Sequence, residues 1–210
     1  MSSITVDTKC RLCRAEGIKL YLKGNRCLSG KCPIEKKGAV PPGMHGVKRA
    51  RKPTDYGLQL RAKQKIKRLY GINETQLKNY YLKAKKLKGP VGDNLLILLE
   101  RRFDNAVYLS GFAASRNQAR QFISHYHLSV NNSRVNVASY QLKSKDTISF
   151  NPKTLSKFQD SFKFTEKDFK PPSCLSVDSQ KSQVKITSLP RREDVNPITD
   201  INLIIEYYSR

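Results

Sequence analysis

Four cysteines near the N-terminus are the residues of this chain whose type and spacing are best suited to chemistry. They read C-x2-C, then thirteen residues, then C-x4-C, and are Cys10, Cys13, Cys27 and Cys32. Two close pairs joined by a loop can supply the four thiolates of a tetrahedral zinc site. The spacer is slightly short and the second pair slightly wide for this pattern, so disulfides, a redox pair or an iron–sulfur cluster stay open as alternatives. We expect one structural zinc ion here, and an ordinary free thiol at the isolated Cys174.

Residue sets typical of enzymes do not occur in the sequence. We find no paired carboxylates, no Ser/His/Asp set, no phosphate-binding loop and no H-E-x-x-H stretch. The chain contains 17 acidic residues, three histidines and no tryptophan, so few groups are suited to acid–base chemistry. We therefore expect no catalytic residues, no enzymatic activity and no small-molecule substrate.

The charge of the chain points to a polyanionic partner. Lys and Arg number 40 against 17 Asp and Glu, a formal net charge of +23, and residues 1–70 hold 18 of these cations but only four acids. Nucleic acid is the first candidate partner and an anionic membrane the second. The longest apolar run is Leu95–Leu99, far short of a membrane span, and the N-terminus lacks the apolar stretch of a signal peptide. We expect a cytoplasmic protein that binds no membrane.

Helical periodicity begins after a basic, glycine-rich loop. Residues 55–70 place Leu58, Ala62, Ile66 and Leu69 on one stripe that should face a core. A second helix is expected from a weak cap at residues 73–76 up to Gly89 and Pro90, and a well-buried third helix over residues 93–111.

The pattern then changes to that of a small α+β unit. Ser115 and Gln118 fit a capping box that opens a helix over residues 116–126. Short strands are expected at 127–130, 134–137 and 147–150, where apolar and polar residues alternate. Residues 151–185 are polar, lysine-rich and without clear boundaries. The apolar, β-prone residues 201–210 should dock on a folded domain.

Two basic regions could contact nucleic acid. The loop over residues 36–53 holds six Lys or Arg and no acid, and its Pro-Pro-Gly-Met-His-Gly turn indicates a shaped loop rather than a solvated tail. Arg116 and Arg120 lie one turn apart on one helix, near two arginines at 101–102 and two histidines at 125 and 127. Such a helix and the turn after it could bind an RNA duplex through phosphate and 2′-OH contacts, or be an ordinary solvated face.

Three stretches resemble the family of bacterial small-subunit ribosomal protein four. They are PPGMHGVKRARKPTDYGLQLRAKQKIKRLYG, LERRFDNAVYLSGFAASRNQARQFISHYHLSVNNSRVNVASYQLKSKDTISF and the terminal LIIEYYSR. The second resembles the RNA-binding module named after that protein. The resemblance follows the family order over nearly the whole chain and is weakest over residues 151–195.

The resemblance implies an α+β fold in four parts. These are a zinc module at 1–45, a helical domain at 46–97, an inserted RNA-binding module of two helices and short strands at 98–160, and a linker and C-terminal segment at 161–210 that packs back on the helical domain. It also implies the zinc-bearing form of the family, with the four N-terminal cysteines as ligands.

The resemblance further implies a structural constituent of the small ribosomal subunit. Such a protein binds small-subunit rRNA early at a multi-helix junction, nucleates assembly and contacts small-subunit protein five, an interface tied to translational accuracy. Its basic loop lies near the path by which mRNA enters. The candidate RNA-binding residues are Lys48, Arg49, Arg51, Lys52, Tyr56, Gln59, Arg61, Lys63, Lys65, Arg68, Arg101, Arg102, Ser115, Arg116, Asn117, Gln118, Arg120, His125 and His127.

Departures from the family pattern concern Met44, Tyr126 and Lys145. The first replaces a glutamine, and the other two replace glycines, so a helix cap and a late turn should differ in shape. Two rival functions stay open: an RNA-modifying enzyme that carries a related module, and a zinc-dependent DNA-binding regulator.

Overall fold

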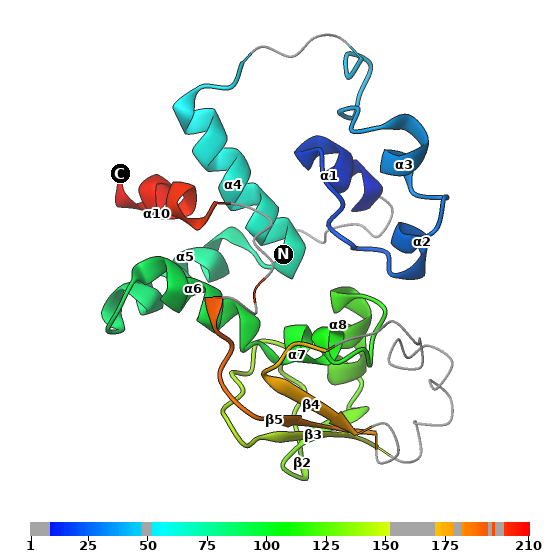
Figure 1. The fold of residues 1–210 in the computed structure, drawn as a ribbon, viewed down its shortest axis with the longest axis vertical. Helices are drawn as coiled ribbons and strands as arrows, with labels where there is room; N and C mark the ends of the chain where they lie inside the picture. The colour runs from blue at the N-terminus through cyan, green and yellow to red at the C-terminus, as the bar shows by residue number, and fades with distance from the viewer. Residues whose placement is uncertain (1–8, 48–51, 152–170, 179–181, 193–194, 196–199) are drawn as a thin grey trace. The chain divides into compact units, whose positions relative to one another are not determined.

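The computed structural model describes residues 9–47, 52–151, 171–178, 182–192, 195 and 200–210. The chain divides into two compact units (Figure 1), Met1–Lys78 with Pro197–Arg210, and Asn79–Asn196. Within the part of the chain that the structure describes, no helix is long and apolar enough to cross a membrane.

Three short helices form the beginning of the first unit. They are α1 (Lys9–Glu16), α2 (Asn25–Leu28) and α3 (Pro33–Lys37), joined by loops. Their core is small: Leu20 and Leu22 are buried beside Cys13, with three half-buried apolar neighbours packed around them. A module with so little apolar burial needs additional stabilisation.

The predicted helix over residues 55–70 is confirmed as α4 (Asp55–Tyr70). The hydroxyl of Thr54 accepts a hydrogen bond from the N–H of Gly57 at 3.2 Å, which caps the N-terminus, and Gly71 ends the helix in the left-handed conformation. The predicted apolar stripe is wrong at Leu58, which is 43% exposed.

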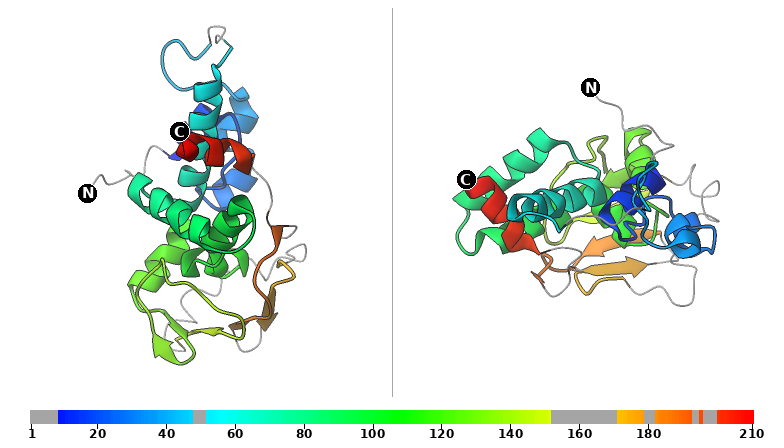
Figure 2. Two further views of the ribbon diagram at one scale, coloured as in Figure 1. Left: turned by 90° about the vertical axis from the view of Figure 1, so that its left-hand side faces the viewer. Right: turned by 90° about the horizontal axis from the view of Figure 1, so that it is seen from above.

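The C-terminal segment forms helix α10 (Ile201–Ser209) and packs against α4. Figure 2 shows the two helices side by side in both views. The β-prone interpretation of this segment is therefore wrong. The side chain of Asp200 accepts a hydrogen bond from the N–H of Asn202 at 2.9 Å, and Ile201 and Ile204 bury one side of the helix, so the cap and the three-residue spacing outweigh local β-propensity.

Helix α5 (Glu74–Lys86) agrees with the second predicted helix, but the third is interrupted. It consists of α6 (Val91–Glu100) and α7 (Phe103–Leu109), separated at Arg101 and Arg102. Arg102 is extended, with φ of −65° and ψ of 137°, and pairs with Gln141 in a β-bridge. Periodicity could not reveal this break because both halves are apolar at helical spacing.

The second unit continues with α8 (Arg116–Ser124) and a five-stranded antiparallel sheet. The strands are β1 (Leu128–Val130), β2 (Ser133–Arg134), β3 (Thr147–Phe150), β4 (Leu175–Asp178) and β5 (Gln183–Ile186), in the order β2-β1-β3-β5-β4. The predicted strand at 134–137 is shorter and earlier than expected, and β4 and β5 were not predicted. The α+β class is confirmed.

Helices α7 and α8 pack together and, with the sheet, enclose the core of the second unit (Figure 1). Phe112 and Phe122 meet the ring of Phe150 edge-on, with centroids 5.1 and 5.8 Å apart. Edge-to-face pairs of this kind contribute beyond the area they bury. This core fixes α8 and the turn that follows it, which carry most of the candidate residues of the module.

Candidate nucleic-acid interface

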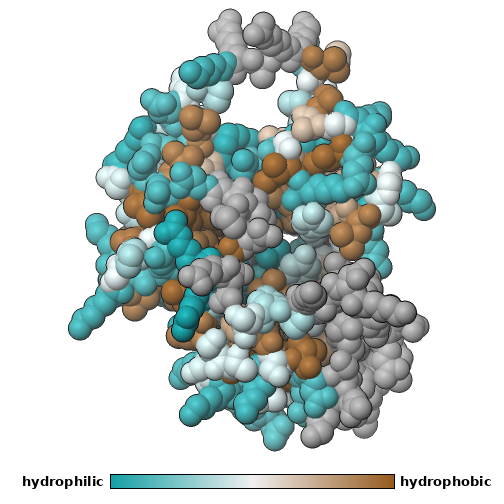
Figure 3. Space-filling view, viewed as in Figure 1, coloured by the Kyte–Doolittle hydropathy of each residue, from teal (hydrophilic) through white to brown (hydrophobic). Residues whose placement is uncertain are grey.

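Three carboxylates in the described chain each bind two cationic side chains. The clusters are Glu16 with Arg61 and Arg68, Glu74 with Lys63 and Lys67, and Asp104 with Arg102 and Arg120. Each cluster therefore keeps a positive charge after internal pairing. Hydrophilic side chains dominate the face drawn in Figure 3, with hydrophobic residues between them.

The Asp104 cluster is buried on one side and open on the other. Arg102 donates to both carboxylate oxygens of Asp104, at 3.1 and 2.9 Å, and to the hydroxyl of Tyr80 at 2.8 Å. Arg120 donates to Oδ2 of Asp104 at 2.5 Å, and its side chain is 33% exposed whereas that of Arg102 is 3% exposed. Arg102 is thus part of the fold, whereas Arg120 reaches the surface of the module.

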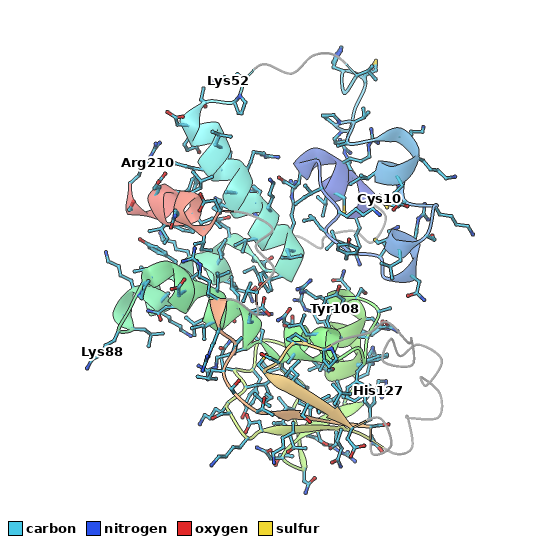
Figure 4. The ribbon with its side chains drawn as sticks, in the orientation of Figure 1. Cys10, Lys52, Lys88, Tyr108, His127 and Arg210 are labelled. Atoms are coloured by element: carbon cyan, nitrogen blue, oxygen red, sulfur yellow. The ribbon has the colours of Figure 1, made fainter. Side chains whose placement is uncertain are left out.

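Arg116 lies one turn before Arg120 on α8 and has its own support. Its Nε donates to Oδ1 of Asn105 at 2.8 Å, and its guanidinium lies 4.5 Å from the ring centroid of Tyr108. Figure 4 shows Tyr108 on α7. A guanidinium packed over a ring and bonded at Nε has its orientation fixed before any partner binds. Sequence reasoning missed Asn105 and Tyr108, since nothing in α7 alone marks them as partners of α8.

Ser115 and Gln118 are used by the start of α8. The Ser115 hydroxyl accepts from the N–H of Gln118 at 3.3 Å, and the side-chain oxygen of Gln118 accepts from the N–H of Ala114 at 2.8 Å. The expected reciprocal cap is therefore shifted by one residue. Asn117, between them, is half-buried. Elsewhere in the module, Arg101 donates a hydrogen bond to the carbonyl of Leu142 at 2.9 Å.

The two histidines lie close together at the end of α8. The rings of His125 and His127 are 5.9 Å apart at 25°, and His127 also meets the ring of Phe122 edge-on at 6.1 Å. His125 is exposed and His127 half-buried, just before β1 (Figure 4). The structure thus brings both predicted histidines to one corner of the second unit.

Several predicted residues of α4 instead hold α10. Gln59 donates to Glu206 at 2.9 Å, and Lys63 lies 4.1 Å from the ring centroid of Tyr207. Both Gln59 and Lys63 are buried. Tyr56 is 50% exposed, and its ring centroid is 5.9 Å from that of Tyr207. Of these three, Tyr56 alone is open to a partner in the described chain.

The carboxylate of Glu74 completes this contact. Lys63 and the hydroxyl of Tyr208 each donate to its Oε1 at 2.8 Å. Burial acts to raise the pKa of the Glu74 carboxyl, but these two hydrogen bonds and the charges of Lys63 and Lys67 lower it below its ordinary value. Burial and the bond to Glu74 raise the pKa of Tyr208.

The remaining basic candidates lie on α4 and before it. Arg61 and Arg68 both bind Glu16, whose side chain is fully buried, while Lys65 is half-buried and Lys52 is exposed (Figure 4). Lys48, Arg49 and Arg51 lie outside the described residues.

The loop before Lys48 is shaped at its base. Arg14 donates to the carbonyls of Val40 and Pro41 at 2.8 and 3.0 Å. A Cβ at Gly46 would lie 2.0 Å from the carbonyl oxygen of Pro41, so only glycine allows this approach. Sequence reasoning missed Arg14, whose partners are backbone groups and leave no pattern in side-chain types.

The four N-terminal cysteines are free thiols; Cys13, Cys27 and Cys32 are buried and Cys10, in α1 (Figure 4), is half-buried. Burial raises the pKa of the Cys13 thiol, and the other three cysteines lie near enough to raise it further. The donor set suits zinc. Among the described residues, however, no group of three or more His, Cys, Asp or Glu side chains is arranged to hold a metal ion.

The fold and the clusters define a class of protein: a strongly basic chain that joins helices to a small α+β module and keeps more cations than its carboxylates neutralise. Comparison with known proteins agrees. Residues 6–100 match the Ribosomal protein S4/S9 N-terminal domain, and residues 101–148 match the S4 domain.

Relatives extend the match over nearly the full chain. Small ribosomal subunit protein uS4 of Halothermothrix orenii is 49% identical over 203 residues, 96% of each chain. Those of Syntrophomonas wolfei and Caldicellulosiruptor bescii are 46% and 47% identical, over 97–98% of this chain and 98% of theirs. The chain belongs to the uS4 family of small ribosomal subunit proteins, as its sequence motifs indicated.

Proposed function

We infer that this chain is a structural constituent of the small ribosomal subunit, in the cytoplasm, that binds rRNA and is not an enzyme. Membership of the uS4 family over almost the whole length supports this function. The structural observation that carries it is the Asp104 cluster inside the S4 domain. One buried carboxylate fixes two arginines there, and the partly exposed Arg120 lies one turn from Arg116.

We assign the RNA surface to the candidates that keep accessible atoms. Arg116 and Arg120 would contact phosphates across a groove of an RNA helix, since their guanidinium groups are held in place before binding. Lys52, Arg61 and Lys65 would add phosphate contacts in the first unit. The buried Gln59, Lys63 and Arg102 are left out because their polar atoms are used within the fold.

The family resemblance suggests a more specific role within the small subunit. We propose early binding at a multi-helix junction of small-subunit rRNA, which nucleates assembly, and contact with small-subunit protein five, which bears on translational accuracy. The basic loop at Lys48, Arg49 and Arg51 would lie near the path by which mRNA enters. The Gly46 turn and the Arg14 bonds support a loop with a fixed base.

We also propose that Cys10, Cys13, Cys27 and Cys32 hold one structural zinc ion, so that residues 1–45 form a module of their own. Four cysteines in two close pairs of the sequence, three of them buried, support this assignment. The ion would link helices whose shared apolar core is small. Because ligand binding and folding are coupled in such modules, loss of one thiol should loosen the segment.

Native mass spectrometry of the full chain with the 5′ region of small-subunit rRNA tests these assignments together. We expect one zinc ion per chain and a one-to-one complex that excess duplex DNA does not dissociate. The Cys27→Ser variant should lose the zinc ion, whereas Cys174→Ser, which changes a buried cysteine of the second unit, should keep it.

The outcomes separate the proposals. A metal-free chain that binds RNA would refute the zinc site and leave the ribosomal function. Tighter binding to duplex DNA would refute rRNA binding and favour a DNA-binding regulator, and turnover of unmodified rRNA would favour an RNA-modifying enzyme.

A further inference from the structure

An exposed tyrosine holds a strained backbone conformation between α8 and β1. Tyr126 has φ of 58° and is 47% exposed. This left-handed region favours glycine, and a bulky side chain there is uncommon. Residues held in such conformations gather at binding sites, where the surrounding structure maintains the strain.

The ring of Tyr126 is held from its far end. Nδ2 of Asn136 donates a hydrogen bond to the tyrosine hydroxyl at 2.7 Å, although both residues are exposed. An exposed ring without such a bond samples several rotamers and loses that freedom on binding. The bond therefore prepares the ring as a binding surface.

Two further rings flank the tyrosine in sequence. His125 and His127 lie on either side of it in the chain, with ring centroids 5.9 Å apart and planes 25° from parallel. The edge contact of His127 with Phe122, which is 3% exposed, ties this group to the core of the second unit. The chain thus presents aromatic residues at three consecutive positions of a rigid corner.

The same corner contains a cation. In the β1–β2 register Arg134 pairs with Ser129, which is two residues after His127. Arg134 is exposed and precedes Asn136 by two residues. Because Asn136 binds the Tyr126 hydroxyl, Arg134 belongs to the strand that leads to this contact and could pair with the phosphate of a nucleotide at Tyr126.

We propose that Tyr126 is the stacking platform for one unpaired base of the rRNA, with His125 and His127 beside it and Arg134 near the adjoining phosphate. The inference rests on the proposed rRNA binding and adds to it one contact, the stacking of a base on Tyr126. The base must be unpaired because a base inside a duplex has no free face. Stacking on a ring tolerates any base, since every base has a π-face.

Variants of the full chain test the platform by affinity for the 5′ region of small-subunit rRNA. Tyr126→Gly and Tyr126→Leu should each weaken binding on the order of tenfold, because both remove the π-face and leucine keeps much of the bulk. Tyr126→Phe should stay within about twofold of the wild type. The melting temperature of Tyr126→Gly should be unchanged or raised, since glycine relieves the strain.

Tyr21 provides a matched control. It also has a left-handed backbone, with φ of 51°, and is 40% exposed, but it lies in the first unit. Tyr21→Gly makes the same chemical change and should leave affinity unchanged. An equal loss of affinity in this variant would overturn the proposal.

Nitration of tyrosine in the wild-type chain gives a test that does not depend on variant folding. Tyr126 should react with tetranitromethane in the free protein and be shielded in the complex. Wild-type affinity in Tyr126→Gly, or no shielding of Tyr126 in a formed complex, would overturn the stacking platform alone. Failure of the wild-type chain to bind the RNA would instead remove the proposed function itself.

Discussion

At the scale of single residues, the buried carboxylates explain how so basic a chain positions its cations. Asp104 is 1% exposed and accepts from both Arg102 and Arg120. A guanidinium as buried as that of Arg102 would lose its hydration without compensation if the carboxylate were absent. Asp104 therefore stabilises the fold and, through Arg120, places a cation at the surface.

Asp104→Asn should lower the free energy of unfolding by about 3–5 kcal/mol, because it leaves a buried arginine without its counter-charge. Chemical denaturation measures this loss. Asp93→Asn is the matched control, since Asp93 and Arg192 form a pair whose side chains are 29% and 66% exposed. That variant should change stability by no more than about 1 kcal/mol, and equal losses in both would contradict the argument.

At the scale of elements, the contact of α10 with α4 depends on polar groups as well as apolar ones. Ile201 and Ile204 are buried, while Tyr208 and Lys63 share the carboxylate of Glu74. Since the folded pKa of Glu74 is lowered, its contribution to stability is present above the unfolded value and is lost as pH falls through the folded pKa.

The docking of α10 should therefore weaken in acid, at pH values below the ordinary carboxyl range. Glu74→Gln should reduce stability at neutral pH and flatten its dependence on pH over that acid range. Hydrogen exchange of α10 amides against pH checks this prediction. Tyr208→Phe, which removes one of the hydrogen bonds, should give a smaller effect in the same direction, and an unchanged acid dependence in Glu74→Gln would contradict it.

The sequence anticipated elements with strong local signals and missed those fixed by distant partners. The capping residue Ser115 marks a helix start that a single sequence can reveal. The break at Arg102 depends on Tyr80 and Gln141, which are far along the chain, so no local pattern encodes it. Strands β4 and β5 do carry alternating apolar residues, but the polar sequence around them obscured that signal.

In the candidate site, too, the sequence identified residue types but not the features that depend on distant partners. Charge and residue type identified Arg102 and Arg120 alike as candidates, but could not show that Arg102 is buried and Arg120 partly exposed. Similarly, the spacing of α4 cannot distinguish the buried Lys63 from the exposed Arg61 unless the position of α10 is known. Burial depends on how the elements pack, so it cannot be inferred from which residues are basic.

At the scale of the whole molecule, the net charge of +23 lowers the stability of the free chain and strengthens its binding to polyanions. The cations repel one another within the folded chain, because Glu16, Glu74 and Asp104 are each shared by two of them. The same excess attracts polyanions and makes binding release counterions. Added salt screens both interactions, and the Debye length falls to about 10 Å at 0.1 M.

The melting temperature of the free chain should therefore rise with potassium chloride, while its affinity for rRNA falls. Affinity should drop on the order of a hundredfold or more between about 50 and 200 mM salt if several phosphates are contacted. Thermal unfolding and binding titrations over the same salt series measure the two responses on one preparation. A melting temperature that falls with salt would show that ion pairs outweigh repulsion in the free chain. An affinity independent of salt would mean that the excess cations do not contact phosphates, and would leave stacking and hydrogen bonds to account for RNA binding.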